Sequence, residues 1–251
     1  GTDPSVCEHI QWKLKSRGEH RGWKVSDLSV DGYMIKGLVD RQLPQVPRDA
    51  THLIISIGGN NALCVMEEVD ALGHWKFLPP FLLYAIYRGI KKLKREYDHM
   101  LAAALTLNKP IIVCTLYHPG FGLKRRNILE RPMVISRSAN FFSRFINSAA
   151  TKLNGYVTRG VVAVGVEAIN YGIIRTAARS KKLPIIDLAA VFNDANDYAN
   201  PIEPSGQGGD KISQNILFAV LCHDFSGPSR KYDHREISND GKYPRFPRKK
   251  K

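Results

Sequence analysis

The chain has 251 residues, of which 43% are hydrophobic and 24% are charged. These values are typical of a globular protein and exclude a wholly disordered one, and the length suits a single domain with a sizeable core. The longest apolar stretch, residues 77–87, is interrupted by two prolines and is shorter than the ~18 residues that suggest a membrane-spanning helix, so we expect no membrane span.

The formal net charge of +14 is concentrated in two segments. Residues 229–251 carry nine Lys or Arg against three Asp or Glu, and residues 121–163 carry eight against one, so the remainder is nearly neutral. We therefore expect a domain over residues 1–224 with a basic insertion at about 121–163, followed by a basic disordered tail over 225–251. Because a basic tail is most often a solvated one, nucleic-acid binding is not expected.

Four cysteines, at positions 7, 64, 114 and 222, are scattered without a Cys-x-x-Cys pair. Cys64 and Cys114 lie in apolar surroundings, so we expect buried free thiols, which suit a reducing compartment and favour a cytoplasmic location. The chain begins at Gly1 without an initiator methionine or a signal segment, and we interpret it as a fragment or a processed product.

The hydrophobic pattern predicts alternating helices and strands, which is typical of a parallel α/β sheet. Helices are expected over residues 5–17, 34–43, 81–107, 166–182 and 212–221. Strands are expected over residues 23–30, 52–57, 110–116 and 184–188, with loops at 60–80 and 191–209. An amphipathic candidate helix at 138–153 either packs on the domain or meets a membrane surface or a partner.

Polar residues follow the predicted strands at positions where α/β proteins bind ligands. In HLIISIGGNNAL, residues 52–63, an apolar strand runs into Gly58-Gly59 and then Asn60. Gly32 follows the strand before it, and His118 follows the strand after it, where it either faces the same site or is solvated. A backbone N–H and an asparagine amide that converge on one point form an oxyanion hole, which is the usual device of acyl transfer.

Three motifs are the most specific in the chain: VDG at 30–32, IGGNNAL at 57–63 and DYANPIEPSGQGGDKI at 197–212. On these residues the chain resembles the SGNH (GDSL-like) hydrolase family over about residues 4–221, except for the insertion. The resemblance implies a flavodoxin-like three-layer parallel sheet and ester hydrolysis by a Ser-His-Asp arrangement. It also implies that the Gly32 N–H and the Asn60 amide match the oxyanion hole, while Asn61 stands where the third motif usually carries Asp.

The chain departs from the family at the catalytic positions. The family's nucleophile lies in a Gly-Asp-Ser turn after the first strand, and this tripeptide does not occur here. The Asp and His of the last motif are replaced by Asn200 and Glu203, as in the recurring NPIEPS-type variant of the family. Glu203 acts as a base only if burial raises its pKa toward neutral, and Asp197 either orients a partner or makes turn hydrogen bonds.

The family's first strand is central in its sheet, and we expect it to be missing from this chain. The strands at 24–30 and 52–57 then either pair directly or belong to an incomplete version of a functional protein, and we favour the second.

The leading hypothesis is an SGNH-type hydrolase-like protein that acts on a small acyl ester by serine-type acyl transfer in its complete form. The alternative is a non-catalytic SGNH-like binding domain, and a third is a nucleic-acid or anionic-surface binder that works through the insertion and the tail. No metal cluster, phosphate loop or dinucleotide fingerprint occurs in the sequence, so we expect neither a metal nor a cofactor.

Overall fold

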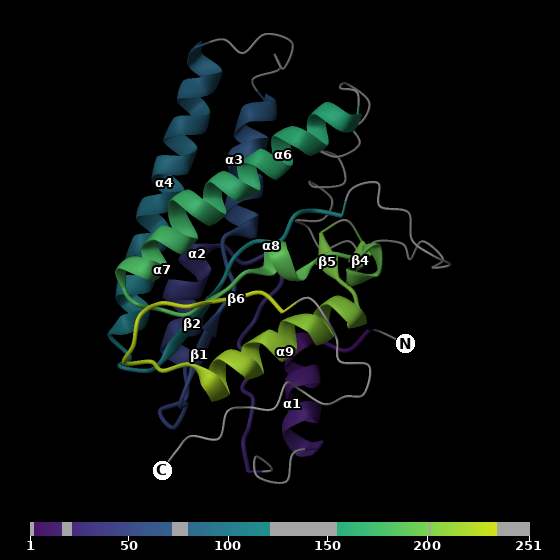
Figure 1. The fold of residues 1–251 in the computed structure, drawn as a ribbon. Helices are drawn as coiled ribbons and strands as arrows, with labels where there is room; N and C mark the ends of the chain where they lie inside the picture. Colours follow the sequence, from purple (N-terminus) through teal and green to yellow (C-terminus); the bar gives the residue numbers. More distant parts are fainter. Residues whose placement is uncertain (1–2, 17–21, 72–79, 121–154, 201, 235–251) are drawn as a thin grey trace.

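The computed structural model describes residues 3–16, 22–71, 80–120, 155–200 and 202–234 (Figure 1). Its centre is a sheet of four parallel strands in the order β1-β2-β3-β6. These strands are β1 (Leu53–Ile55), β2 (Ile111–Cys114), β3 (Ile185–Ile186) and β6 (Lys231–Tyr232). The first three confirm the strands predicted at 52–57, 110–116 and 184–188.

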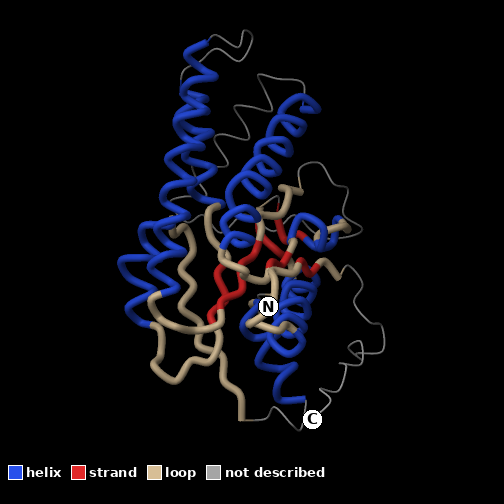
Figure 2. Tube along the Cα trace, turned by 60° about the vertical axis from the view of Figure 1, so that its left-hand side comes forward, coloured by secondary structure: helices blue, strands red, loops and turns tan. Residues whose placement is uncertain are grey.

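Successive residues of each strand face opposite sides of the sheet and contribute to two separate cores. Ile111 and Val113 of β2 pack with α2 (Ile35–Gly37), α4 (Pro80–Leu105) and α7 (Thr176–Ser180). Ile112 and Cys114 of the same strand pack with α1 (Val6–Ser16) and α9 (Gly206–Cys222) on the other face. Figure 2 shows the strands between these two helical layers. The predicted three-layer α/β architecture with a parallel sheet is confirmed.

The helices α1, α4 and α9 confirm those predicted at 5–17, 81–107 and 212–221. The predicted helix at 166–182 is the second half of a longer helical run formed by α6 (Gly155–Ile169), the π-helix η4 (Asn170–Arg175) and α7. The predicted helix at 34–43 divides into α2, the π-helix η2 (Leu38–Gln42) and the 3-10 helix η3 (Leu43–Gln45). The remaining elements are α3 (Gly59–Ala71), α8 (Leu188–Val191), the 3-10 helix η5 (Ala195–Asp197), β4 (Tyr198–Asn200) and β5 (Glu203–Pro204).

The strand predicted at 23–30 is wrong, because this segment joins no sheet. Side-chain amides take the place of a neighbouring strand. The Val25 N–H donates to the side-chain oxygen of Gln11 (3.2 Å), and the Leu28 carbonyl accepts from the side-chain amide of Gln42 (2.6 Å). Direct pairing of residues 24–30 with β1 therefore does not occur, and no strand covers the outer edge of β1 in the part of the chain that the structure describes.

The prediction of a loop over residues 60–80 is also wrong for its first half, because residues 60–71 belong to α3. This helix packs closely on α4, where a Cβ on Gly89 would lie 2.5 Å from Cγ1 of Val65. The contact with α4 explains why a segment with weak helix signals is helical. It also leaves Cys64 exposed, contrary to the expectation of a buried thiol, whereas Cys114 is buried as expected.

The predicted start of the disordered tail, residue 225, is too early, because Lys231–Tyr232 form an edge strand of the sheet. Tyr232 is buried, its carbonyl accepts from the Asp187 N–H (2.8 Å), and the Arg230 carbonyl accepts from the Ile185 N–H (2.8 Å). These bonds hold the segment up to residue 234 in the fold. Residues 155–163 of the expected insertion belong to α6, whereas the candidate helix at 138–153 and residues 235–251 lie outside the described residues.

No helix in the described ranges is both long and apolar enough to cross a membrane.

Candidate functional site

Three parallel strands end at the same edge of the sheet, and the segments that leave this carboxyl edge carry Asn60, Asn61 and His118 of the predicted site. Gly58 to Asn61 follow β1, Thr115 to His118 follow β2, and Asp187 follows β3. Tyr117 connects this edge to the last motif, because its hydroxyl donates to the Ile202 carbonyl (2.5 Å). The segments predicted to form the site are therefore neighbours in space.

Asn60 and Gly32 lie beside each other at this edge. The Asn60 side-chain amide donates to the carbonyl of Tyr33 (3.0 Å), the residue that follows Gly32. Gly32 occupies a turn with a φ of 76°, which glycine adopts without the strain that a side chain would bring. The Gly32 N–H makes no hydrogen bond to another described residue, and the Asn60 amide keeps a second N–H. The two residues matched to the oxyanion hole thus lie on neighbouring segments at this edge.

Asn61 points in another direction and joins two elements of the fold. Its side-chain oxygen accepts from the Ile35 N–H (3.0 Å) and its amide donates to Glu96 (3.0 Å). It is nearly buried, with 9% of its surface exposed. The structure therefore places Asn61 between α2 and α4, with both its amide oxygen and its amide nitrogen engaged by the protein.

Asn200 and Glu203 form a local turn on the surface. The Asn200 side-chain oxygen accepts from the N–H groups of Ile202 and Glu203 (both 3.0 Å), and its amide donates to the Glu203 carboxylate (2.5 Å). Glu203 is exposed, so it lacks the burial that the sequence hypothesis required. The pair is placed at the carboxyl edge, but Glu203 lacks the environment that the sequence hypothesis required of a general base.

Asp197 is fully buried beneath the same loop and paired with a residue that the sequence hypothesis missed. Its carboxylate lies 2.8 Å from the buried ammonium of Lys211 in α9. It also accepts from the N–H groups of Asn193 (3.0 Å) and Asp194 (2.9 Å) and from the side chain of Gln207 (2.9 Å). These bonds tie the loop to α9, so the structure places Asp197 under the site and not at its surface.

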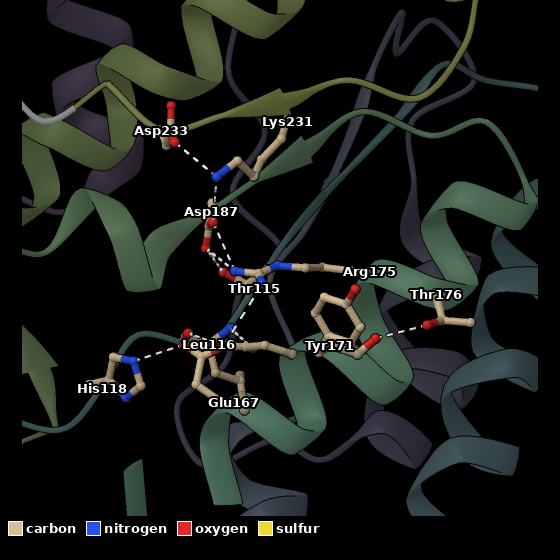
Figure 3. A network of polar contacts seen from close by, with 11 residues as sticks. Thr115, Leu116, His118, Glu167, Tyr171, Arg175, Thr176, Asp187, Lys231 and Asp233 are labelled. Atoms are coloured by element: carbon tan, nitrogen blue, oxygen red, sulfur yellow. Dashed lines mark hydrogen bonds and ion pairs between the residues drawn. The ribbon is translucent and has the colours of Figure 1, made fainter. Parts of the chain in front are cut away.

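His118 faces a carboxylate from the long helical run, as Figure 3 shows. Its Nε2 lies 2.9 Å from Oε1 of Glu167, while its Nδ1 is buried without a hydrogen-bond partner among the described residues. Asn170 fixes the backbone beside it by exchanging two hydrogen bonds of 2.8 Å with Leu116. His118 is therefore held at the carboxyl edge by an acidic partner, an arrangement that orients an imidazole.

A chain of alternating charges continues from this pair across the sheet edge (Figure 3). Arg175 lies 3.8 Å from Glu167 and donates to both carboxylate oxygens of Asp187 (2.7 and 2.8 Å), and Lys231 lies between Asp187 and Asp233. Burial of Asp187 favours its neutral form, but the hydrogen bonds and charges of Arg175 and Lys231 outweigh burial and lower its pKa. The carboxylate is thus fixed in its charged form.

Asp187 directly follows β3, so it lies just past the carboxyl end of a parallel strand, as Asn60 and His118 do. Sequence reasoning passed over it, together with Glu167, Arg175 and Lys211. The sequence holds no signal for Lys211, because a lysine in an amphipathic helix is usually exposed.

No family model matches the chain, and no curated protein matches it. Among solved structures, an extracellular lipase from Streptomyces rimosus matches with a TM-score of 0.46 and 14% sequence identity, over 82% of this chain and 85% of the lipase chain. This similarity identifies none of the residues of the site.

Proposed function

We propose that the carboxyl edge binds the carbonyl group of a small carboxylic ester and that the protein is an SGNH-type, hydrolase-like acyl-transfer protein. The observation that supports this function is the hydrogen bond from the Asn60 amide to the residue that follows Gly32, whose own N–H has no partner among the described residues. Two N–H donors at one point stabilise the negative charge that develops on a carbonyl oxygen during acyl transfer. This role needs neither a metal nor a cofactor.

The proposal assigns these residues the electrostatic part of the chemistry. The sequence contains no Gly-Asp-Ser turn to match the family's nucleophile, and no serine is assigned that role. Glu203, being exposed, is not assigned the role of base.

The test is hydrolysis of 4-nitrophenyl acetate and butyrate by the protein and by the variants Asn60→Asp and Asn60→Ala. Both variants remove the amide donor, and loss of one oxyanion-hole donor reduces kcat by roughly 10²–10³-fold. Glu203→Gln is the matched control, since an exposed carboxylate is expected to leave the rate within about twofold. Turnover that Asn60→Ala does not change would contradict the assignment.

A second function, ligand binding without turnover, is favoured by the exposure of Glu203 and by its hydrogen bond to Asn200. Titration with an acetyl or butyryl amide, which resists hydrolysis, tests it by NMR chemical shifts. Binding that Asn60→Ala weakens, in a protein that hydrolyses neither ester, supports the binding domain. A protein that neither binds nor hydrolyses these compounds contradicts both functions.

A further inference from the structure

The outer face of α4 carries a feature that neither the fold nor the proposed function requires. Figure 1 shows that α4 extends well beyond the sheet with α3 and α6 beside it, and the tube in Figure 2 shows the long helices extending beyond the strands from another side. Its inner face is buried through Leu93, Tyr97 and Met100. Its outer face between residues 84 and 95 is exposed to solvent.

Residues 84–95 contain five basic residues and no acidic one, although the chain outside the two strongly basic segments is nearly neutral. The basic residues are Arg88, Lys91, Lys92, Lys94 and Arg95. Lys94 is paired with Asp98 (2.6 Å), whereas the other four form no ion pair with a residue that the structure describes. Within the described part of the chain, the positive charge of these four side chains is therefore not neutralised by an ion pair.

Two exposed aromatic rings accompany these charges. Tyr84 and Tyr87 are 60% and 58% exposed, in contrast to the buried Tyr97 of the same helix. The guanidinium of Arg88 lies 5.8 Å from the Tyr84 ring, and the ammonium of Lys91 lies 5.8 Å from the Tyr87 ring. We name Tyr84, Tyr87, Arg88, Lys91 and Arg95 together the α4 stripe.

The spacing of the α4 stripe aligns its members along one side of the helix. Tyr84, Arg88, Lys91 and Arg95 follow one another at intervals of four, three and four residues, which places them on one face. At a rise of about 1.5 Å per residue the stripe is about 16 Å long. The stripe is therefore long enough for several side chains to contact one nucleic-acid strand together.

We propose that the α4 stripe is a binding surface for single-stranded nucleic acid, with the basic side chains at the phosphates and the tyrosine rings stacked on bases. This combination of cations and exposed aromatic rings is the one that binds single strands without sequence preference. In duplex DNA the bases are already stacked on one another and offer the rings no free face. An anionic membrane suits the surface less well, because membrane-surface helices bury a broad apolar face, and the large exposed apolar side chains of α4 between residues 84 and 95 are two tyrosines.

The experiment measures fluorescence anisotropy of a labelled 12-nucleotide oligothymidylate with the full chain over a series of salt concentrations. The triple variant Arg88→Gln/Lys91→Gln/Arg95→Gln removes three phosphate contacts. The matched control, Lys15→Gln/Arg48→Gln/Arg179→Gln, removes three exposed charges elsewhere and so keeps the same net charge. A second pair of variants, Tyr84→Ala/Tyr87→Ala and Tyr84→Phe/Tyr87→Phe, separates stacking from charge.

The α4 triple variant is expected to weaken binding at least tenfold at low salt and to reduce the slope of log K against log salt by about 2. The control triple variant is expected to stay within about twofold of the unchanged protein. The alanine pair is expected to lose about tenfold in affinity at an unchanged slope, and the phenylalanine pair to bind normally.

Equal losses in the two triple variants would overturn the proposal, because binding would then depend on overall charge. Tighter binding of a 12-base-pair duplex, or binding only to vesicles that contain phosphatidylserine, would also overturn it. None of these outcomes bears on ester binding by Asn60.

Discussion

Lys211 is the clearest single residue on which the candidate site depends, because it pairs with the predicted site residue Asp197. Its ammonium is buried and lies 2.8 Å from the buried carboxylate of Asp197 and 2.7 Å from the side-chain oxygen of Asn193. Asp197 in turn fixes the loop that leads to Asn200. A buried charge without its partner is costly, so this contact decides whether the loop keeps its position.

Lys211→Met is therefore expected to reduce the free energy of unfolding by about 3–5 kcal/mol, because it leaves the Asp197 carboxylate buried and unpaired. Urea denaturation followed by circular dichroism measures the change. Lys94→Met, which breaks the exposed pair with Asp98, is the matched control and is expected to cost less than about 1 kcal/mol. Adding Asp197→Asn to Lys211→Met should recover part of the loss, and a further loss would contradict the role given to the pair.

Neighbouring residues of the same type show why the site was only partly predictable. Asn60 and Asn61 were both expected at the site, yet only Asn60 lies beside Gly32. Residues that follow one another in a helix point about 100° apart, so they cannot both face one ligand. The sequence indicated the carboxyl edge correctly, but the directions of side chains depend on α3, which was predicted as a loop.

The pair formed by α3 and α4 depends on one close approach. A Cβ on Gly89 would lie 2.5 and 2.9 Å from the two methyl carbons of Val65, and a β-branched side chain has little freedom to move away. Gly89 therefore fixes the distance between the two helices that rise beyond the sheet.

Gly89→Ala is expected to destabilise the protein by about 1–3 kcal/mol, since the added methyl group overpacks the interface. Gly165→Ala in α6 is the matched control, because no described atom outside the helix's own backbone and the two neighbouring residues lies within 4 Å of its added Cβ. That substitution is expected to be neutral or to stabilise by about 0.5–1 kcal/mol. Thermal unfolding measures both, and Val65→Ala in the Gly89→Ala background should restore the lost stability. A neutral Gly89→Ala would show that the helices separate without cost.

Long elements with a regular pattern were predictable, and elements that need a partner were not. The apolar spacing of α4 follows from its sequence, because a 3.6-residue period requires no knowledge of neighbours. The segment at 23–30 alternates apolar and polar residues as a strand does, but some of its backbone groups form hydrogen bonds with glutamine side chains and not with another strand. β6 is the opposite case, since its two residues become a strand only through β3.

The C-terminal segment, residues 223–234, packs around two histidines, His223 and His52. His223 is buried and its Nδ1 lies 3.0 Å from the Tyr232 hydroxyl. His52, just before β1, packs against Phe225, with the two ring centroids 5.2 Å apart. Burial lowers the pKa of His52, and burial lowers that of His223 against the opposing charge of Asp224.

Both histidines are therefore held neutral in the folded protein, and the unfolded chain binds more protons below its histidine pKa of about 6.5. The stabilising effect is fully present above that pH and is lost as the pH falls through the lowered pKa values. We expect the free energy of unfolding, measured in urea at pH 7.5 and 5, to decrease toward acid. His52→Gln/His223→Gln should flatten this dependence, whereas the exposed His99→Gln should leave it unchanged. An equal slope in all three proteins would contradict the assignment.

Every pairing in the sheet joins distant parts of the chain, because Leu53 pairs with Ile111, Val113 with Ile185, and Ile185 with Lys231. Closing these long loops costs conformational entropy before any strand contact forms. Such non-local topologies fold slowly, in milliseconds to seconds. During that interval the apolar strands are unpaired, so refolding at high protein concentration is expected to compete with aggregation.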